Sequence, residues 1–364
     1  MYERQSLNIT MINLYELSQA ELAALLADWG EAKFRAKQVW DWLYERRVAD
    51  FDSMSNLPKP LRDRLKAECQ IGHLSVASEQ KSKDGTTKRL YRLADGQLIE
   101  SVLMPYDDER RTACISSQAG CAMGCVFCAT GQMGFARHLS ATEIFEQAAL
   151  FARELEAEGE RLSNVVLMGM GEPFHNYDNV LLAIRRLMSD LGIGARHITV
   201  STVGLVPQIR RFAEEGLQVT LAISLHKATD AERSALLPIN KRWNLNSLLE
   251  ACHYYAEKTG RRISFEWAAI AGENDTLLEA HELGALLKGL HCHVNIIPLN
   301  PTGGYAGKPS DMSTLNAFIA VLASYAVSAT VRVRRGIDID AGCGQLKSKV
   351  IRANQIAIHD ANER

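Results

Sequence analysis

The segment Gln118-Ala-Gly-Cys121-Ala-Met-Gly-Cys125-Val-Phe-Cys128 contains three cysteines in one short loop. Thiolates are the soft ligands that iron–sulfur clusters take, and close spacing lets one loop wrap around a cluster. A zinc site, the alternative, usually combines two Cys-x-x-Cys pairs or adds a pair of histidines. The chain has no second cysteine pair of this kind, and His138 is alone near the loop. The spacing therefore favours a cluster held by Cys121, Cys125 and Cys128, with one iron open to an external ligand.

Outward from this loop, apolar segments with strand character alternate with amphipathic helical segments. Repeated β-then-α units predict an α/β fold with a parallel sheet and helices outside it, either doubly wound or a full or partial barrel. In either arrangement the chemistry belongs at the C-terminal ends of the strands. Strands are expected at residues 113–117, 164–168, 197–201, 218–224, 263–269, 293–298 and 330–334. Helices are expected between them, among others at 142–158, 247–258, 277–290 and 313–324.

The sequence before the loop divides into two parts. Residues 1–73 are predicted to be helical, because Ser18 and Glu21 have the spacing of a capping box and Pro60 lies near the first turn of a later helix. Residues 74–106 are predicted to form a short β extension around the Ala94-Asp95-Gly96 turn. The core domain then covers residues 107–346, and residues 347–364 form a C-terminal tail.

Composition sets limits on location and partners. The net charge of -2, from 41 basic and 43 acidic residues, gives no general electrostatic reason for nucleic acid to bind, so any RNA contact must come from local patches. No run of 18 apolar residues is present, and the first residues are polar and acidic where a signal peptide needs apolar ones. We therefore expect a cytoplasmic protein with no membrane partner. In such a chain the eight cysteines are not expected to form a disulfide framework.

Glycines and polar residues follow several of the expected strands. Glycine allows a ligand to approach the backbone closely, and a carboxylate can accept a hydrogen bond from an ammonium group. Taken singly, each of these residues is more often a cap or turn residue than a ligand contact. The candidates are Gly171, Glu172, Ser201, Ser224, Leu225, His226 and Asn300.

A Cys-x-x-x-Cys-x-x-Cys loop after the first strand of a β/α domain resembles the radical S-adenosylmethionine (SAM) superfamily. The resemblance implies a 4Fe-4S cluster whose open iron binds the methionine moiety of SAM, and reductive cleavage of SAM to a 5′-deoxyadenosyl radical. It also implies that the Gly171-Glu172-Pro173 region contacts the methionine amino group. The same resemblance makes the other strand-end candidates SAM contacts.

The segment Arg334-Arg-Gly-Ile-Asp-Ile-Asp-Ala-Gly-Cys343-Gly-Gln-Leu346 narrows the family. Together with Ser224-Leu-His226 and Ile239-Asn-Lys, it resembles the adenine-C2 RNA methyltransferases of the RlmN family. The N-terminal sequence also resembles that of the family, so the resemblance covers nearly the whole chain. It implies a partial (β/α)6 barrel with an N-terminal helical domain that binds RNA.

The family resemblance also implies roles for three further residues. Cys343 would be methylated by one SAM, and its methyl group would then pass to carbon 2 of adenine. Glu100 would remove the ring proton, and Cys114 would release the adduct by forming a disulfide with Cys343. The interval from Cys114 to Cys121 matches that of the family. Without the resemblance, Cys114 is better explained as a buried strand cysteine; the remaining cysteines, Cys69, Cys252 and Cys292, are interpreted as structural.

The substrates implied by the resemblance are an adenosine in 23S rRNA and, in many bacterial members, one in tRNA. A flavodoxin- or ferredoxin-type protein would be the reductant. Adenine would have to leave its stack to reach the site. Short basic runs could contact phosphates around a barrel mouth, although each alone is usually a solvated face. These runs are Lys81-Ser-Lys83, Lys88-Arg89, Arg110-Arg111, Lys241-Arg242 and residues 332–335.

Three alternatives remain open from the sequence. The nearest keeps the mechanism but methylates carbon 8 of the rRNA adenine, as the Cfr resistance enzymes do. A second is a non-catalytic iron–sulfur or zinc protein, against which the accessible Cys343 in its small-residue loop argues. A third is a radical enzyme that acts on a protein or a small molecule.

Overall fold

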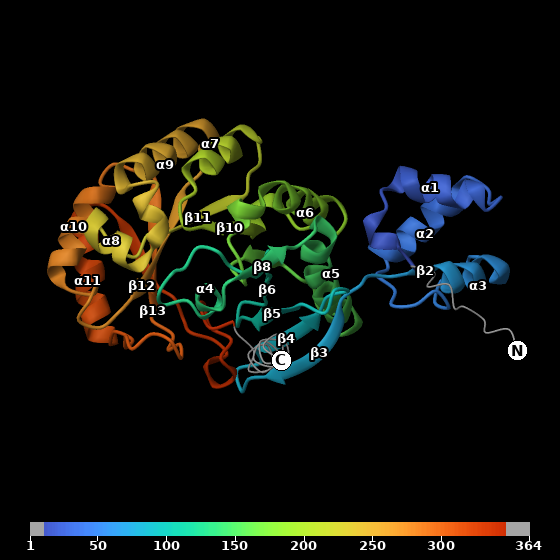
Figure 1. The fold of residues 1–364 in the computed structure, drawn as a ribbon, viewed down its shortest axis with the longest axis horizontal. Coiled ribbons are helices and arrows are strands. Elements are labelled where there is room, and N and C mark those ends of the chain that lie inside the picture. The colour runs from blue at the N-terminus through green and yellow to red at the C-terminus, as the bar shows by residue number, and fades with distance from the viewer. Residues whose placement is uncertain (1–10, 347–364) are drawn as a thin grey trace, which may run out of the picture.

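The computed structural model describes residues 11–346, and a ten-stranded sheet of order β14-β13-β12-β11-β10-β9-β6-β5-β4-β3 runs through them (Figure 1). The expected C-terminal tail at 347–364 lies outside the described residues. So do residues 1–10, whose polar sequence is unlike a signal peptide. Among the described helices, none is both long and apolar enough to span a bilayer.

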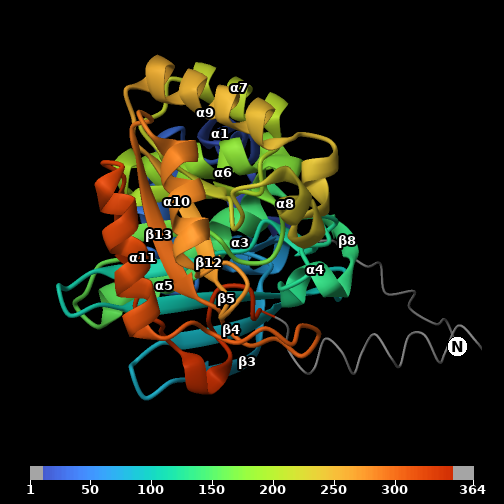
Figure 2. The same cartoon turned by 90° about the vertical axis from the view of Figure 1, so that its left-hand side faces the viewer.

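Seven neighbouring strands of this sheet are parallel to one another. Helices connect successive strands and cover the outer face of the sheet (Figures 1 and 2), so six β/α units are followed by a last strand. In the described residues β14 and β3 remain the two open edges, and the expected partial barrel is confirmed. The parallel strands are β6 (Arg111–Cys114), β9 (Asn164–Leu167), β10 (Ile198–Thr202), β11 (Thr220–Ser224), β12 (Ile263–Ala269), β13 (Cys292–Pro298) and β14 (Ser328–Val331).

The helices around the barrel have the amphipathic pattern that buries one face against the sheet. Ser140 and Glu143 form a capping box that begins the first of them, α5. Gly260, in the left-handed conformation, ends α9. The helices are α5 (Ala141–Ala157), α6 (Tyr177–Ser189), α7 (Val206–Glu214), α8 (Asp230–Leu236), α9 (Leu245–Thr259), α10 (Leu277–Leu287) and α11 (Met312–Ser324).

Three antiparallel strands continue the sheet beyond β6. They are β3 (Ser75–Lys81), β4 (Thr87–Arg92) and β5 (Leu98–Pro105), and the turn expected at residues 94–96 joins the last two. The strand expected at 330–334 instead ends at Val331, so the arginines that follow belong to the loop that leads to Cys343.

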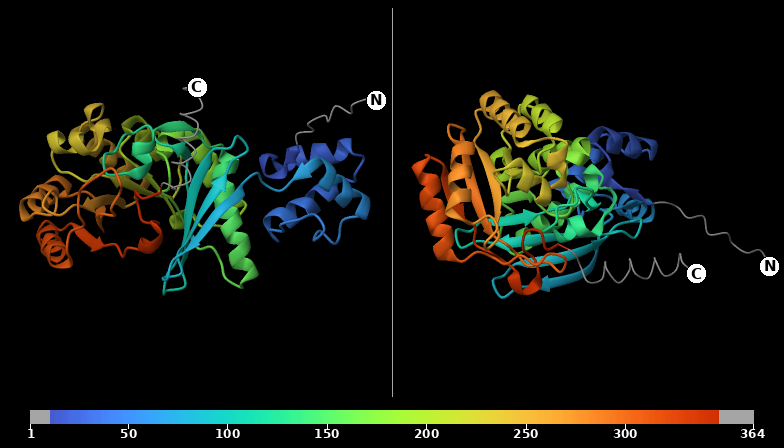
Figure 3. Two further views of the ribbon diagram at one scale, coloured as in Figure 1. Left: turned by 60° about the horizontal axis from the view of Figure 1, so that its bottom comes forward. Right: turned by 60° about the vertical axis from the view of Figure 1, so that its left-hand side comes forward.

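Three short helices form the N-terminal part: α1 (Gln19–Asp28), α2 (Phe34–Tyr44) and α3 (Lys59–Glu68). The predicted capping box of Ser18 and Glu21 is present. A two-stranded parallel pair, β1 (Ile12–Asn13) with β2 (Cys69–Gln70), holds the ends of this part together. The unit lies beside α5 and α6 (Figures 1 and 3), where Arg186 donates to the Tyr15 carbonyl at 2.8 Å and to the Tyr44 hydroxyl at 3.0 Å.

Candidate active site

A cavity of about 960 Å³, counting the space open to solvent, lies at the C-terminal ends of the parallel strands. Loops after β9, β10, β11 and β13 contribute its walls, as expected for a β/α barrel. The predicted residues that line it are Cys121, Cys125, Cys128, Gly171, Glu172, Ser201, Ser224, His226, Asn300 and Cys343.

The cysteine loop is fixed at both ends. It follows β7 (Gln118–Gly120), which pairs with β8 (Phe135–His138) after the short helix α4 (Ala129–Met133). The Cys121 N–H donates to the Gly134 carbonyl at 2.8 Å, and the Cys128 N–H donates to the Cys125 carbonyl at 3.2 Å. All three thiols are free, and burial raises the pKa of Cys121 to about 12. The loop therefore turns three unpaired thiols toward one cavity.

The spacing of these thiols is wider than a single tetrahedral ion requires. In the described chain the three sulfurs do not all lie within 4.8 Å of one another. A tetrahedral zinc ion needs sulfurs about 3.8 Å apart, given its short Zn–S bonds. The wider spacing suits a cluster, whose ligands bind different iron atoms.

Gly171 and Glu172 form the wall next to the loop. A side chain at Gly171 is excluded, because its φ is +106° and an added Cβ would lie 2.6 Å from the Cβ of Gln118. The Glu172 N–H donates to the Gln118 Oε1 at 2.8 Å, which holds this turn against β7. The Glu172 carboxylate accepts the N–H groups of Phe174 and Val203, each at 2.9 Å. Burial raises the pKa of Glu172 to about 7.

His226 adopts a left-handed backbone conformation, with φ of +62°, that is rare outside glycine. Its Nδ1 accepts the Ala268 N–H at 2.9 Å, so the neutral ring carries its proton on Nε2. The Asn274 amide donates to the His226 carbonyl at 2.8 Å. Burial lowers the pKa of His226 to about 3, so the ring is neutral at physiological pH.

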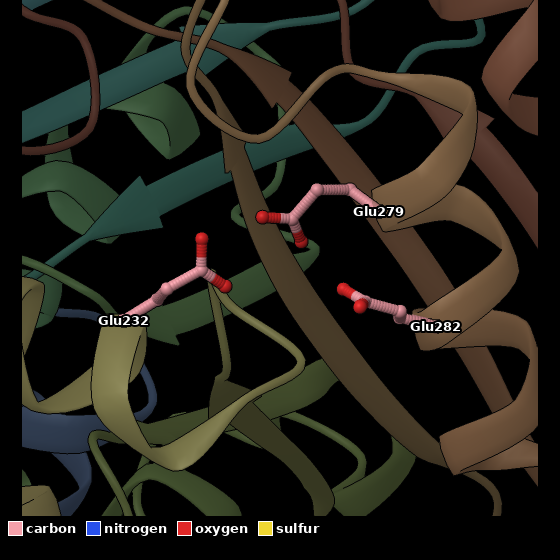
Figure 4. A group of neighbouring side chains, drawn as sticks. All are labelled: Glu232, Glu279 and Glu282. Atoms are coloured by element: carbon pink, nitrogen blue, oxygen red, sulfur yellow. The ribbon is translucent and has the colours of Figure 1, made fainter.

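The next residue, Lys227, is anchored by acidic side chains. Glu232, Glu279 and Glu282 face one another (Figure 4), and the Lys227 ammonium lies 3.1 Å from Glu232 and 2.5 Å from Glu279. It also donates to the Glu273 carbonyl at 2.6 Å. Because the ammonium already pairs with two of the three carboxylates, we interpret the group as an anchor for the loop after β11 rather than a metal site.

A second cavity of about 500 Å³ adjoins the first, and Cys343 lines both. Cys114, at the end of β6, and Arg332 line the second cavity, and both thiols are free. Burial raises the pKa of Cys114 to about 12. The neighbouring Cys343 raises the pKa of Arg332, so the guanidinium stays charged beside the two sulfurs.

Asn300 and α4 hold the Cys343 segment. The Asn300 Nδ2 donates to the Cys343 carbonyl at 3.1 Å, while its Oδ1 is buried and has no hydrogen-bond partner among the described residues. The Ala129 N–H donates to the Gly344 carbonyl at 2.7 Å. A buried amide oxygen of this kind is suited to accept a hydrogen bond from a ligand in the cavity.

Two predicted site residues lie outside the walls of both cavities. Glu100 is buried on β5, where it shares a face with Val102, the residue that pairs with Cys114 in β6. Its carbonyl accepts the Ser116 hydroxyl at 2.6 Å. Leu225 is fully buried in the hydrophobic core, and its N–H donates to the Glu266 carbonyl at 3.1 Å. The structure thus brings the backbone of Leu225, but not its side chain, next to the site.

Two cavity residues were not singled out from the sequence. Glu266 on β12 lines the first cavity and accepts hydrogen bonds from Ser264 at 2.9 Å and Asn295 at 2.8 Å. Polar residues at every second position of an otherwise apolar strand were the available signal. Arg332 was treated only as part of a basic run, although its side chain lines the second cavity.

The prediction that Lys88 and Arg89 contribute to a phosphate-contacting surface is wrong. Both are buried: Arg89 pairs with Glu79 and Glu154, and Lys88 donates to the Asp340 carbonyl at 3.2 Å. Strand β4 lies inside the extended sheet, so its basic side chains satisfy internal partners.

Comparison with known proteins identifies the family. Residues 12–71 match the model of the ribosomal RNA large subunit methyltransferase N-terminal domain, and residues 115–283 match the radical SAM superfamily. The dual-specificity RNA methyltransferase RlmN 1 of Myxococcus xanthus is 54% identical over 95% of this chain and 97% of its own length. The chain belongs to the RlmN family. A probable RlmN of Geobacillus kaustophilus is 46% identical over 93% of each chain.

A solved structure agrees with this RlmN membership. A radical SAM methyltransferase from Sphaerobacter thermophilus superposes with a TM-score of 0.88 at 46% identity, covering 92% of this chain and 99% of that one. The chain is therefore a radical SAM methyltransferase, and the superfamily implies a 4Fe-4S cluster and SAM as its cofactors.

Proposed function

We propose that this enzyme methylates carbon 2 of an adenine in 23S rRNA and in tRNA, and that Cys343 carries the methyl group. The single observation behind the route is that Cys343 lines both cavities, one with the three-cysteine loop and one with Cys114. The names of the relatives, dual-specificity RNA methyltransferases, support RNA as the substrate.

The residues present fit both cofactors. Cys121, Cys125 and Cys128 would hold the cluster, because all three are free and widely enough spaced. The Glu172 carboxylate would accept a hydrogen bond from the SAM ammonium group, and the Asn300 Oδ1, which has no partner among the described residues, would accept a further hydrogen bond. Backbone and side-chain groups of the remaining strand ends would complete the SAM site: Gly171, Ser201, Ser224, Leu225 and His226. When bound, SAM supplies the methyl group, and its cleavage at the reduced cluster supplies a carbon radical.

The chain's own residues then carry the transfer. The Cys343 sulfur accepts a methyl group, for which the thiolate is the nucleophile. After losing a hydrogen atom, the S-bound carbon bonds to carbon 2 of adenine, a position that polar methylation does not reach. Glu100 accepts the ring proton. The Cys114 sulfur bonds to the Cys343 sulfur as the carbon–sulfur bond breaks, and the released carbon takes up a proton to become the methyl group on the base. A flavodoxin- or ferredoxin-type reductant supplies the electrons that the cycle needs, including those that reopen the disulfide.

Mass spectrometry of nucleosides tests this proposal. RNA that lacks the modification is incubated with reconstituted enzyme, SAM and reductant, beside the variants Cys343→Ala and Cys252→Ala. Cys252 is buried in α9, away from both cavities, and serves as the matched control. We expect 2-methyladenosine from the wild type and Cys252→Ala, and none from Cys343→Ala. Appearance of 8-methyladenosine would reassign the position, and SAM cleavage without a methylated base would refute RNA as the substrate.

A further inference from the structure

Arg233 on α8 is fully buried behind the cofactor cavity and binds several strand ends at once. Its Nη2 donates to the carbonyls of Val203, at 2.8 Å, and Ser224, at 3.0 Å, which follow β10 and end β11. Its Nε donates to the Leu225 carbonyl at 3.2 Å. The fork of one guanidinium therefore fixes the positions of two neighbouring strand ends.

The Arg233 charge has no carboxylate partner within ion-pair distance in the described chain. Its Nη1 donates to the Asn240 Oδ1 at 2.7 Å, and Asn240 in turn donates to the Asp230 carboxylate at 2.8 Å. The neutral amide thus separates the two charges. Burial lowers the pKa of Arg233 to about 10, so the guanidinium remains charged at neutral pH. A buried charge without a counter-charge is costly, so an anion is needed nearby in the loaded enzyme.

The C-terminal end of α8 contacts the cysteine loop. The Val126 N–H donates to the Leu236 carbonyl at 3.1 Å, and Cys125 packs with Leu236 and Leu237 in one apolar cluster. Leu236 follows Arg233 by three residues on α8, so its contact with the cysteine loop places Arg233 within one helical turn of that loop. A cluster held by three thiolates is anionic, and it would lie on this side of the arginine.

We propose that Arg233 is a positioning residue that fixes the Val203 and Ser224 carbonyls behind the cavity, and whose charge favours the reduced state of the cluster bound at Cys125. This inference rests on cluster binding by the proposed active site. Reduction adds a negative charge to the cluster, so a nearby positive charge in a low-dielectric interior stabilises the reduced form more than the oxidised form.

A redox titration of the reconstituted holoenzyme, followed by electron paramagnetic resonance, tests the charge. At a fixed ambient potential, we expect Arg233→Gln to lower the ratio of reduced to oxidised cluster roughly tenfold, and Arg233→Lys to stay within about twofold of wild type. Arg89→Gln is the matched control, because Arg89 is a buried arginine of β4 that pairs with Glu79 and Glu154. It is expected to lower stability and leave the ratio unchanged.

A second variant keeps the arginine and brings a carboxylate into direct contact with it. Asp230→Asn with Asn240→Asp gives up the hydrogen bonds that Asn240 donates to Asp230, and places a carboxylate next to Arg233 without altering the net charge of the chain. We expect the reduced fraction to fall in this double variant too, even if Arg233→Gln does not fold.

SAM binding, measured by calorimetry, reports on the positioning role. Lysine cannot bond to the Val203, Ser224 and Leu225 carbonyls together as the guanidinium does. For Arg233→Lys we therefore expect weaker SAM binding with an unchanged ratio of reduced to oxidised cluster. Unchanged redox ratios in Arg233→Gln and the double variant would overturn the charge role, and unchanged SAM affinity in Arg233→Lys would overturn the positioning role. Failure of the wild type to take up a cluster would instead refute the proposed function on which both rest.

Discussion

The Asp84 carboxylate accepts the Gly336 N–H at 2.9 Å and so ties the turn between β3 and β4 to the segment that carries Cys343. Ser82 in the same turn donates to Asp338 at 2.5 Å. Desolvation raises the pKa of Asp84, but hydrogen bonds from the N–H groups of Gly336 and Thr86 outweigh it and lower the pKa to about 2. The antiparallel extension therefore supports the segment that carries Cys343 directly.

Asp84→Ala should loosen that segment. We expect a local loss of about 1 kcal/mol, reduced by the exposure of the turn, and faster amide hydrogen exchange across residues 334–346. Because the folded pKa is depressed, the wild-type contribution is present above the ordinary pKa and is lost as pH falls toward about 2. Asp107→Ala, at an exposed position on the β5–β6 turn, is the control. Equal exchange in both variants would contradict the prediction.

Gly171→Ala should strain the turn that carries Glu172. The added Cβ would meet the Gln118 Cβ at 2.6 Å and its backbone N at 2.8 Å, at a φ that L-residues rarely adopt. We expect a loss of about 3 kcal/mol in denaturant unfolding, together with weaker SAM binding. Gly216→Ala isolates the backbone cost, because its φ is +66° and nothing lies within 4 Å of an added Cβ. A loss at Gly171 no larger than that at Gly216 would show that the contact with Gln118 relaxes freely.

His226 should make stability depend on pH. Its folded pKa of about 3 lies below the ordinary value of 6.5, so the unfolded chain binds the extra proton first. The contribution is complete above pH 6.5 and declines as pH falls toward about 3, by about 1.4 kcal/mol per pH unit. His226→Asn removes this titration, and asparagine tolerates the left-handed backbone. Chemical unfolding of both proteins between pH 7.5 and 5 should give curves that converge as pH falls; parallel curves would mean that the pKa of His226 is the same in the folded and the unfolded chain.

Cys114→Ala should trap the protein–RNA adduct. Without the second thiol, the carbon–sulfur bond between Cys343 and the base has no partner to break it. We expect a covalent RNA–protein species on a denaturing gel and little free methylated nucleoside. Cys69→Ala, a buried cysteine of β2, should release product normally. Normal release by Cys114→Ala would remove Cys114 from the proposed route.

Local signals in the sequence were sufficient for most of the barrel. Strand β12 has the predicted bounds, because its apolar run is long and ends at clear breaks. Strand β3 lies in the predicted β extension, but no separate strand was expected at its residues, since all seven are exposed and show no apolar alternation. It forms because its backbone pairs with the edge of β4, and this pairing cannot be read from the residues of β3 alone.

The residues of the candidate site likewise fall into those that the sequence indicated and those that only the fold reveals. Cys121 and its partners are neighbours in sequence, so their spacing alone indicated a common ligand. Arg233 and Glu266 carry no motif, and their importance depends on which distant strands they meet. The prediction for Arg89 was wrong for the same reason, because its partners come from other elements. The basic pair in the sequence does not reveal that Glu79 and Glu154 pair with Arg89 inside the fold.

The wall between the two cavities has a consequence for timing. Met168, Ile297, Asn300 and Cys343 belong to both cavities, so in the proposed route one thiol faces SAM on one side and RNA on the other. The two need not be present together. In the proposed route, an enzyme molecule can therefore be methylated on Cys343 in advance and keep that group until a nucleic acid arrives. A first rapid turnover, limited to one equivalent per protein molecule, is the kinetic signature of such a store.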